Sequence, residues 1–436
     1  MNSGTQNKKN HRHPPLHDIR GGVVTFVTMA YILAVNPAIL SAAGIPKADI
    51  FFATCVASAV ATLLMGLYAK YPFALAPGMG LNAFFAYTVC IAGKVPWQMA
   101  LAAVLFSGIL FMVFSVTGLR KRFLEAVPKD LGLAIAGGIG LFIAFIGLQH
   151  AHLVVKNDAT MVALGKLQSK HALVAFAGLS ATIVLVSAKI RGAVLIGMAA
   201  STTLAVLLGV GEAPSQIFAM PQLPEKTLGV AFTRLPDLAT LQMLPIVFTM
   251  LFVDMFDTMG TLLALGHSSG HIRESGQLPR ANRAFFSDAT GTIVGALLGT
   301  STVTTYIESG AGIIDGARTG LAAIVTAILF AASLFLFPLF AAIPEAATAP
   351  ALIVVGALMF VQAAKIDWKR TPVAISAALT ILSMPVTYSI STGIGIGFIT
   401  FSLGTLAEKR TLPLMVGIIS ILFVVYFTVQ AIFFGG

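Results

Sequence analysis

Residues 73–85 read FALAPGMGLNAFF, and residues 300–312 read TSTVTTYIESGAG. Both stretches lie in long apolar regions, but Pro77 and two glycines interrupt the first, and polar and β-branched residues begin the second. Each pattern predicts a short extended piece that leads into a half-helix. Irregular backbone at membrane depth is tolerated only where protein or a watery cavity satisfies its polar groups, so the two stretches together indicate a site inside a membrane protein.

The composition excludes a soluble globular protein. Of 436 residues, 57% are hydrophobic and 10% are charged, against about 25% charged in ordinary soluble domains. The mean hydropathy is +0.92. Apolar runs of about 20 residues recur along the chain, each long enough to span a bilayer as a helix, and they do not alternate as barrel strands do. The sequence therefore predicts an all-α polytopic membrane protein. The expected spans are residues 21–43, 50–68, 73–92, 97–118, 131–150, 172–188, 192–210, 244–266, 285–299, 300–316, 319–343, 346–364, 371–387, 390–407 and 412–433.

Basic residues are distributed unevenly between alternate loops. With the N-terminus in the cytoplasm, 20 of the 27 Lys and Arg residues fall on the inner side and seven on the outer side. Cytoplasmic loops retain positive charge, so the formal charge of +10 indicates topology rather than a nucleic-acid partner. We expect a multi-pass protein of the cell inner (cytoplasmic) membrane, surrounded by membrane lipid, with a cytoplasmic N-terminus.

The chain divides near its middle. Residues 1–20 form a polar cytoplasmic tail, and residues 211–243 form an external linker that contains four prolines. Seven spans in residues 21–210 precede the linker, and this odd number reverses the orientation of the spans in residues 244–433. The sequence thus predicts two inverted repeats, which is the plan of many secondary transporters.

One region leaves the number of spans open. Pro385 and the glycines of residues 393–397 break the apolar sequence between residues 371 and 407. This region forms either two short spans, which makes fifteen in total, or one re-entrant hairpin, which makes fourteen.

Three of the 17 acidic residues lie within predicted spans, namely Asp254, Asp257 and Glu308. The others, including Asp288, are assigned to the span edges. A charged residue at a helix centre costs about 2.5–3.5 kcal/mol on insertion scales, and the spans hold no Lys or Arg to pair with these acids. They are either protonated acids that are hydrogen-bonded within the bundle or a substrate or proton site. Asp254 and Asp257 share one helix face, which Thr261 continues.

Two motifs are set aside. Residues 78–83 fit a G-x-G-x-x-A fingerprint, but a dinucleotide turn requires a soluble βαβ unit. His267 and His271 are four residues apart, but the polar turn between them favours solvent over a metal site. We find no nucleophile elbow, Walker loop or zincin pattern, and we expect no enzyme activity, metal or cofactor.

With these residues identified, the chain resembles the nucleobase:cation symporter-2 family, and more closely its AzgA-like branch of adenine/guanine/hypoxanthine permeases. Four blocks carry the resemblance: residues 25–37 (TFVTMAYILAVNP), 76–85 (APGMGLNAFF), 252–261 (FVDMFDTMGT) and 303–312 (VTTYIESGAG). Arg318-Thr319-Gly320 follows the last block. The chain departs from the family at residues 313–317 (IIDGA), where relatives tend to have small residues and a Gly-Gly pair.

The resemblance implies about fourteen spans in two inverted seven-span repeats. A core domain (about 21–118 and 244–343) would hold the substrate, and a gate domain (about 131–210 and 346–433) would pair with a second subunit in a homodimer. The implied activity is uptake of purine nucleobases coupled to protons. A uracil or xanthine symporter of the wider family and an anion transporter of similar fold are the alternatives.

The resemblance also implies roles for individual residues. The predicted substrate-binding residues are Gly80, Asn82, Asp254, Glu308 and Ser309. The predicted proton-coupling residues are Asp257 and Glu308, and the supporting residues are Thr258, Thr261 and Thr305. We expect Glu308 and Asn82 to meet the purine edge from the two half-helices.

Overall fold

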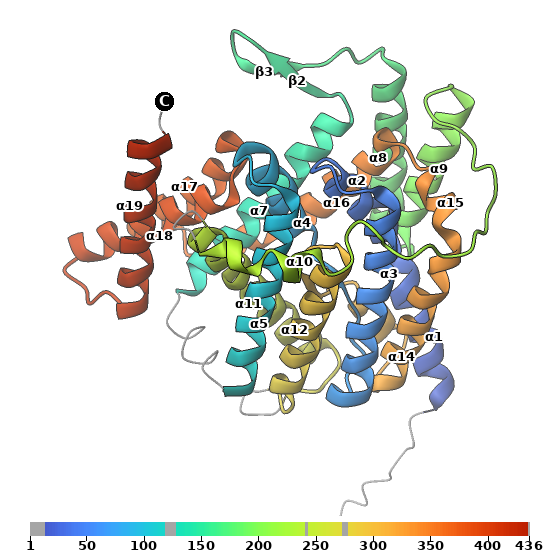
Figure 1. Cartoon of the computed structure of the whole chain (residues 1–436), viewed down its shortest axis with the longest axis horizontal. Helices are drawn as coiled ribbons and strands as arrows, with labels where there is room; N and C mark the ends of the chain where they lie inside the picture. The colour runs from blue at the N-terminus through green and yellow to red at the C-terminus, as the bar shows by residue number, and fades with distance from the viewer. Residues whose placement is uncertain (1–13, 118–127, 240–242, 273–277, 435–436) are drawn as a thin grey trace, which may run out of the picture.

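The computed structural model describes residues 14–117, 128–239, 243–272 and 278–434. Helices account for almost all of the regular structure (Figure 1). In chain order the elements are α1 (Pro15–Met29), α2 (Ile32–Ser41), α3 (Lys47–Leu64), η1 (Met65–Ala69), β1 (Leu75–Pro77), α4 (Met79–Ala83), η2 (Phe84–Ala92), α5 (Trp97–Thr117), α7 (Lys129–His150), β2 (Val154–Asn157), β3 (Met161–Leu164), α8 (Lys170–Ser187), α9 (Ala193–Leu207), α10 (Val230–Thr233), η3 (Leu235–Leu238), α11 (Met243–Ser268), α12 (Ala281–Leu298), β4 (Val303–Thr305), α13 (Ser309–Ile314), α14 (Gly320–Ala332), η4 (Ser333–Leu336), α15 (Phe337–Ala341), α16 (Glu345–Phe360), η5 (Val361–Lys365), α17 (Thr371–Thr387), α18 (Ile390–Ala407) and α19 (Leu414–Phe434).

The helices have the lengths that a membrane requires. Within the described residues, nine helical stretches are long and apolar enough to cross a bilayer, and four shorter apolar helices accompany them. The predicted all-α membrane fold is therefore confirmed. Helix α1 begins at Pro15, inside the stretch assigned to the N-terminal tail, and residues 1–13 of that tail lie outside the described residues.

The two interrupted stretches meet at the centre of the molecule. Strand β1 pairs antiparallel with β4, so that Leu75 lies opposite Thr305 and Pro77 opposite Val303. The half-helix α4, which continues into η2, follows β1, and the half-helix α13 follows β4 closely. The expected strand and half-helix are thus present in both stretches. Each strand satisfies the backbone groups of the other, which is how extended backbone persists at membrane depth.

The region around Pro385 forms two helices. α17 and α18 pack against each other and are joined by two residues, of which Tyr388 adopts a left-handed conformation (φ 54°) that ends α17. They contain 17 and 18 residues, slightly fewer than the ~20 that a perpendicular span needs. The region therefore folds as two separate helices, of which α18 is long and apolar enough to cross a bilayer and α17 is one of the shorter apolar helices.

A close contact between α7 and α16 relates the two halves of the chain. A Cβ atom added at Gly140 would lie 2.6 Å from the carbonyl oxygen of Gly356, and one added at Gly356 would lie 2.5 Å from that of Gly140. Each glycine stands twelve residues after a proline, Pro128 and Pro344, that immediately precedes its helix. This reciprocal contact at equivalent positions is the relation expected of inverted repeats.

Asp18 of α1 forms hydrogen bonds with the residues that precede α14. Its carboxylate accepts hydrogen bonds from the backbone N–H of Arg318 (2.8 Å), from that of Thr319 (3.0 Å) and from the Thr319 hydroxyl (2.6 Å). A carboxylate at a helix N-terminus satisfies free N–H groups and interacts favourably with the helix dipole.

Asp18→Ala is expected to destabilise the protein by about 2 kcal/mol, because hydrogen bonds to a charged group each contribute about 1.5–3 kcal/mol and water replaces part of them. Thermal melting of the detergent-purified protein measures the effect. Asp158→Ala is the control, since the Asp158 side chain is 93% exposed. Equal melting temperatures for the two variants would contradict the assignment.

Candidate functional site

Asn82 lies in the half-helix α4, directly after β1. Its side chain is fully buried, and neither its Nδ2 nor its Oδ1 atom has a hydrogen-bond partner among the described residues. Buried side-chain amides are nearly always hydrogen-bonded, so both atoms of this amide are available to a ligand or to water. Gly80, two residues earlier, lets α4 approach α7, because a Cβ atom there would collide with the side chain of Ile139.

Glu308 precedes the second half-helix, α13. Its Oε1 atom accepts a hydrogen bond of 2.6 Å from the hydroxyl of Tyr31, and its backbone carbonyl accepts one of 3.4 Å from Thr28. Both partners lie in the block of residues 25–37 that carries the family resemblance. Ser309, which was predicted to bind substrate, is buried and accepts a 2.9 Å hydrogen bond from the backbone N–H of Ala74. Its hydroxyl thus ties α13 to the residue before β1.

Asp254 and Asp257 face the strands from α11. The Thr292 hydroxyl donates to Asp254 Oδ2 over 3.3 Å, and the Thr304 hydroxyl donates to Asp257 Oδ2 over 3.4 Å. Asp254 is buried, whereas Asp257 is half-buried. Thr261 lies one turn further along α11 and is also half-buried. Asp257 therefore contacts β4 directly, whereas Asp254 reaches it through Thr292 of α12, whose hydroxyl also bonds to the backbone of Val303.

A fourth acid of this region, Asp288, is buried and was wrongly assigned to the inner edge. The helix expected to begin at residue 285 begins at Ala281 instead, which places Asp288 two turns inside α12. Asp288 is fully buried, and its Oδ2 atom accepts hydrogen bonds from Thr258 (2.7 Å) and Thr305 (3.4 Å). These two predicted supporting residues therefore hold Asp288. The polar residues of the first α12 turn were the available signal, because they extend the helix toward the inner side.

The four carboxyl groups form one electrostatic group. Asp254 interacts with Asp288 and Asp257, and Asp257 interacts with Glu308. No ion pair within the described ranges includes any of them. In the same residues, no three His, Cys, Asp or Glu side chains are arranged to hold a metal ion. The group therefore combines several acids with hydroxyl partners, which suits hydrogen-bonded recognition and proton transfer.

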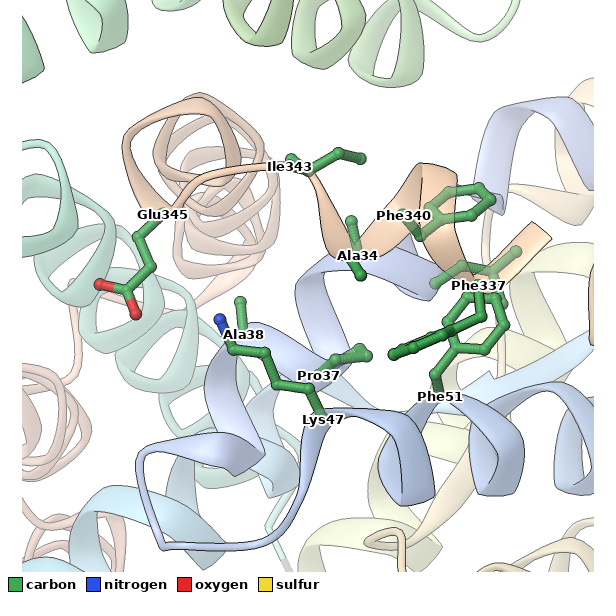
Figure 2. Close-up of a pocket in the computed structure, with 11 residues that line it drawn as sticks. Ala34, Pro37, Ala38, Lys47, Phe51, Phe337, Phe340, Ile343 and Glu345 are labelled. Carbon is green, nitrogen blue, oxygen red and sulfur yellow. The ribbon is translucent and has the colours of Figure 1, made fainter. Parts of the chain in front are cut away.

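A separate cavity lies away from these acids. Figure 2 shows it between α2, the start of α3, α15 and the start of α16, with Pro37, Phe51 and Phe340 among its apolar walls. Lys47 and Glu345 are its charged lining residues. Its volume of about 20 Å³ holds about one water molecule, so a purine does not fit there.

The sequence of the chain is similar to those of known proteins along most of its length. The model of the permease family matches residues 17–396, most of the chain. The chain belongs to the permease family. This permease is 43% identical to the guanine/hypoxanthine permease PbuG of Bacillus subtilis, with 94% of this chain and 96% of that protein covered. It is 36% identical to the adenine permease AdeP of Escherichia coli, over 93% of this chain and 91% of that one.

These relatives confirm the resemblance to the AzgA-like branch and show that the chain is a transporter rather than an enzyme. The permease also resembles the transmembrane domain of the cyanobacterial bicarbonate transporter BicA, with a TM-score of 0.63 over 89% of this chain and 98% of that one. Their sequence identity is 18%, so this likeness concerns the fold alone.

Proposed function

We propose that this permease carries purine nucleobases (adenine, guanine or hypoxanthine) into the cell together with protons, by alternating access. The observation that carries the proposal is the buried, unpartnered amide of Asn82 in one half-helix, together with Glu308 at the start of the other. A purine is flat and neutral, and its edge carries both donors and acceptors. An amide and a carboxylate supply the complementary groups. The relatives named as guanine/hypoxanthine and adenine permeases support the same substrate class.

Protons are the proposed coupling ion. The acids of α11 and Glu308 lie within the membrane region, and their carboxyl groups have hydroxyl rather than cationic partners among the described residues. Intramembrane acids of this kind mark proton or substrate pathways. Asp257 is the proposed proton carrier, and Asp254 positions it from the same helix face.

Two alternatives are weaker on specific grounds. An anion transporter of similar fold would present a basic residue at its site, but β1, α4, β4 and α13 contain no Lys or Arg. A uracil or xanthine symporter of the wider family is weaker because the relatives are named as guanine/hypoxanthine and adenine permeases.

The proposed moving parts are the core and the gate, and contacts join them at both ends. At the outer end, the Tyr87 hydroxyl of η2 pairs with His150 Nε2 of α7 (2.8 Å), and the Thr88 hydroxyl donates to the carbonyl of Tyr388 (3.1 Å). At the proposed inner end, Asp315 of the core, which also pairs with Arg20 of α1, forms an ion pair with Arg191 of the gate, between α8 and α9. We further propose an inner-membrane location, a cytoplasmic N-terminus and a homodimer through the gate.

The proposal is tested by uptake of labelled adenine, guanine, hypoxanthine and uracil into cells that lack their own carriers, with and without a protonophore. Purine uptake that the protonophore abolishes is the expected result. Uptake of uracil alone would replace the substrate class, and purine uptake that is insensitive to the protonophore would remove proton coupling.

Asp315 lies in the segment that departs from the family, and its ion pair with Arg191 gives a prediction about the gate. Arg191→Ala is expected to accelerate amide hydrogen exchange in residues 309–319 about two- to fivefold, since a partly exposed ion pair contributes about 0.5–1 kcal/mol. Mass spectrometry of the purified protein measures the exchange. Lys189→Ala in the same connection is the control, and equal exchange in both variants would show that Arg191 does not restrain α13.

A further inference from the structure

Asp288 is a buried carboxyl group without an assigned role in purine contact. It is 0% exposed, and its Oδ1 atom has no hydrogen-bond partner among the described residues. Asp254 is 1% exposed, and its Oδ1 atom is likewise unpartnered in that part of the chain. The two groups interact electrostatically. A buried carboxylate with no cation beside it is costly in a medium of low dielectric, so we expect these two groups to hold at least one proton between them.

A continuous chain of hydroxyl groups connects Asp288 with Asp257. The Thr258 hydroxyl donates to Asp288 Oδ2 over 2.7 Å and lies 2.9 Å from the Thr304 hydroxyl. The Thr304 hydroxyl in turn reaches Asp257 Oδ2 over 3.4 Å. A threonine hydroxyl both donates and accepts a hydrogen bond, so each of the two is able to receive a proton on one side and release one on the other.

The described elements packed against α12 bring few ionisable side chains besides Asp254 and Asp257. Its neighbours α5, α10, β1 and β4 contain no ionisable side chain, and α11 contributes Asp254, Asp257 and the exposed His267 of its last turn. On α3, Ala61 faces Gly291, and Lys47 and Asp49 lie more than three turns away at the other end of the helix. Cys55 of α3, Tyr68 of η1 and Arg283 of α12 itself complete the set, and the Arg283 guanidinium lies over the Tyr68 ring.

We propose that Asp288 is the buried residue that holds the coupling proton, and that Thr304 and Thr258 relay the proton between Asp288 and Asp257. This inference rests on the proposed proton-coupled function. In the relay, the Asp257 carboxyl passes its proton to Thr304, the Thr304 hydroxyl proton moves to Thr258, and the Thr258 hydroxyl proton moves to Asp288. Both threonines end as neutral hydroxyls, Asp257 ends as a carboxylate and Asp288 as a carboxylic acid, so charge and atoms balance.

The relay gives each acid a distinct part. Asp257 is half-buried and lies within electrostatic range of Glu308, so it exchanges the proton with the binding region. Asp288 is fully buried and accepts a hydrogen bond from Thr305 of β4. In this position it keeps the proton from water while the core moves. A carrier built in this way holds its proton at a different position from its substrate.

Infrared spectroscopy tests the position of the proton directly on the purified, full-length protein. The absorbance of protonated carboxyl groups is followed as the pH is raised. Asp288→Asn is expected to remove one protonated-carboxyl band that the unmodified protein and the exposed control Asp158→Asn retain. Thr258→Val provides a second variant, which is expected to shift the frequency of that band by removing its hydrogen bond. An unchanged band in both variants would overturn the proposal.

Transport tests the relay. Thr258→Val is expected to lose proton-driven accumulation of hypoxanthine while it still exchanges labelled for unlabelled hypoxanthine, and Thr258→Ser is expected to restore accumulation. Thr290→Val is the matched control, because the Thr290 hydroxyl bonds only to the carbonyl of Phe286 on its own helix. Wild-type accumulation by Thr258→Val, or failure of Thr258→Ser to restore it, would contradict a relay through this hydroxyl.

The two experiments separate the inference from the proposed function. If the unmodified protein does not carry purines, the proposed substrate is wrong, and the infrared band of Asp288 still decides where the proton lies. If purine uptake is intact but the band persists in Asp288→Asn, the proposed function stands and the relay is excluded.

Discussion

Glu308→Gln is expected to abolish high-affinity purine binding. The carboxylate accepts from Tyr31 through Oε1, and its other oxygen is the proposed acceptor for purine N–H groups. Glutamine retains an oxygen for Tyr31, so the start of α13 keeps its position, but an –NH₂ group then faces the purine donors. A hydrogen bond to a charged group contributes about 1.5–3 kcal/mol, which corresponds to a loss of roughly ten- to a hundredfold in affinity, and the unpaired donors add to it.

Calorimetric titration of the purified protein with hypoxanthine measures this loss, and uptake by cells measures its effect on transport. Glu225→Gln makes the same chemical change at an exposed residue of the segment between α9 and α10, and it serves as the matched control. Purine uptake by Glu308→Gln equal to that of the control would show that the binding site is wrongly assigned.

Asp257→Asn is expected to remove proton-driven accumulation. An amide in this position neither takes up nor releases a proton at physiological pH, so neither a carrier at Asp257 nor a relay that begins there operates. The amide oxygen still accepts from Thr304, which preserves the local contact seen with the carboxylate. The variant is therefore expected either to be inactive or to equilibrate purine without responding to a protonophore.

Accumulation of labelled hypoxanthine against its gradient, with and without a protonophore, measures this effect. Asp158→Asn, which changes an exposed residue after β2, is the control. Accumulation by Asp257→Asn at the control level, still abolished by the protonophore, would exclude Asp257 from coupling.

Local sequence features predicted much of the candidate site. Pro77 and the glycines beside it interrupt one apolar run, and the β-branched residues before Glu308 interrupt the other; both features act within a few residues of where they stand. The strands and half-helices therefore appear where they were expected. Asp254, Asp257 and Glu308 were recognisable because a charge inside an apolar run is costly wherever the run packs.

Asp288 shows where this reasoning failed. Seven residues separate it from the start of α12, and the polar residues before it resemble a loop in sequence although they form helix. A helix begins where the backbone N–H groups near its first turn find hydrogen-bond partners. Here the Arg280 N–H donates to the hydroxyl of Tyr71, which comes from a distant segment. The hairpin β2–β3, at the top of Figure 1, was also not predicted, because the backbone hydrogen bonds of its strands are satisfied by each other.

The sequence by itself determined that this protein lives in lipid, that two apolar runs break and that three acids stand within spans, because transfer from water and backbone freedom are properties of each residue and its neighbours. Tertiary structure alone decided the pairing of Pro77 with Val303, the shared contact of Gly140 with Gly356 and the chain of hydroxyls from Asp257 to Asp288. These contacts join residues far apart in the sequence, so they exist only once the whole bundle has packed.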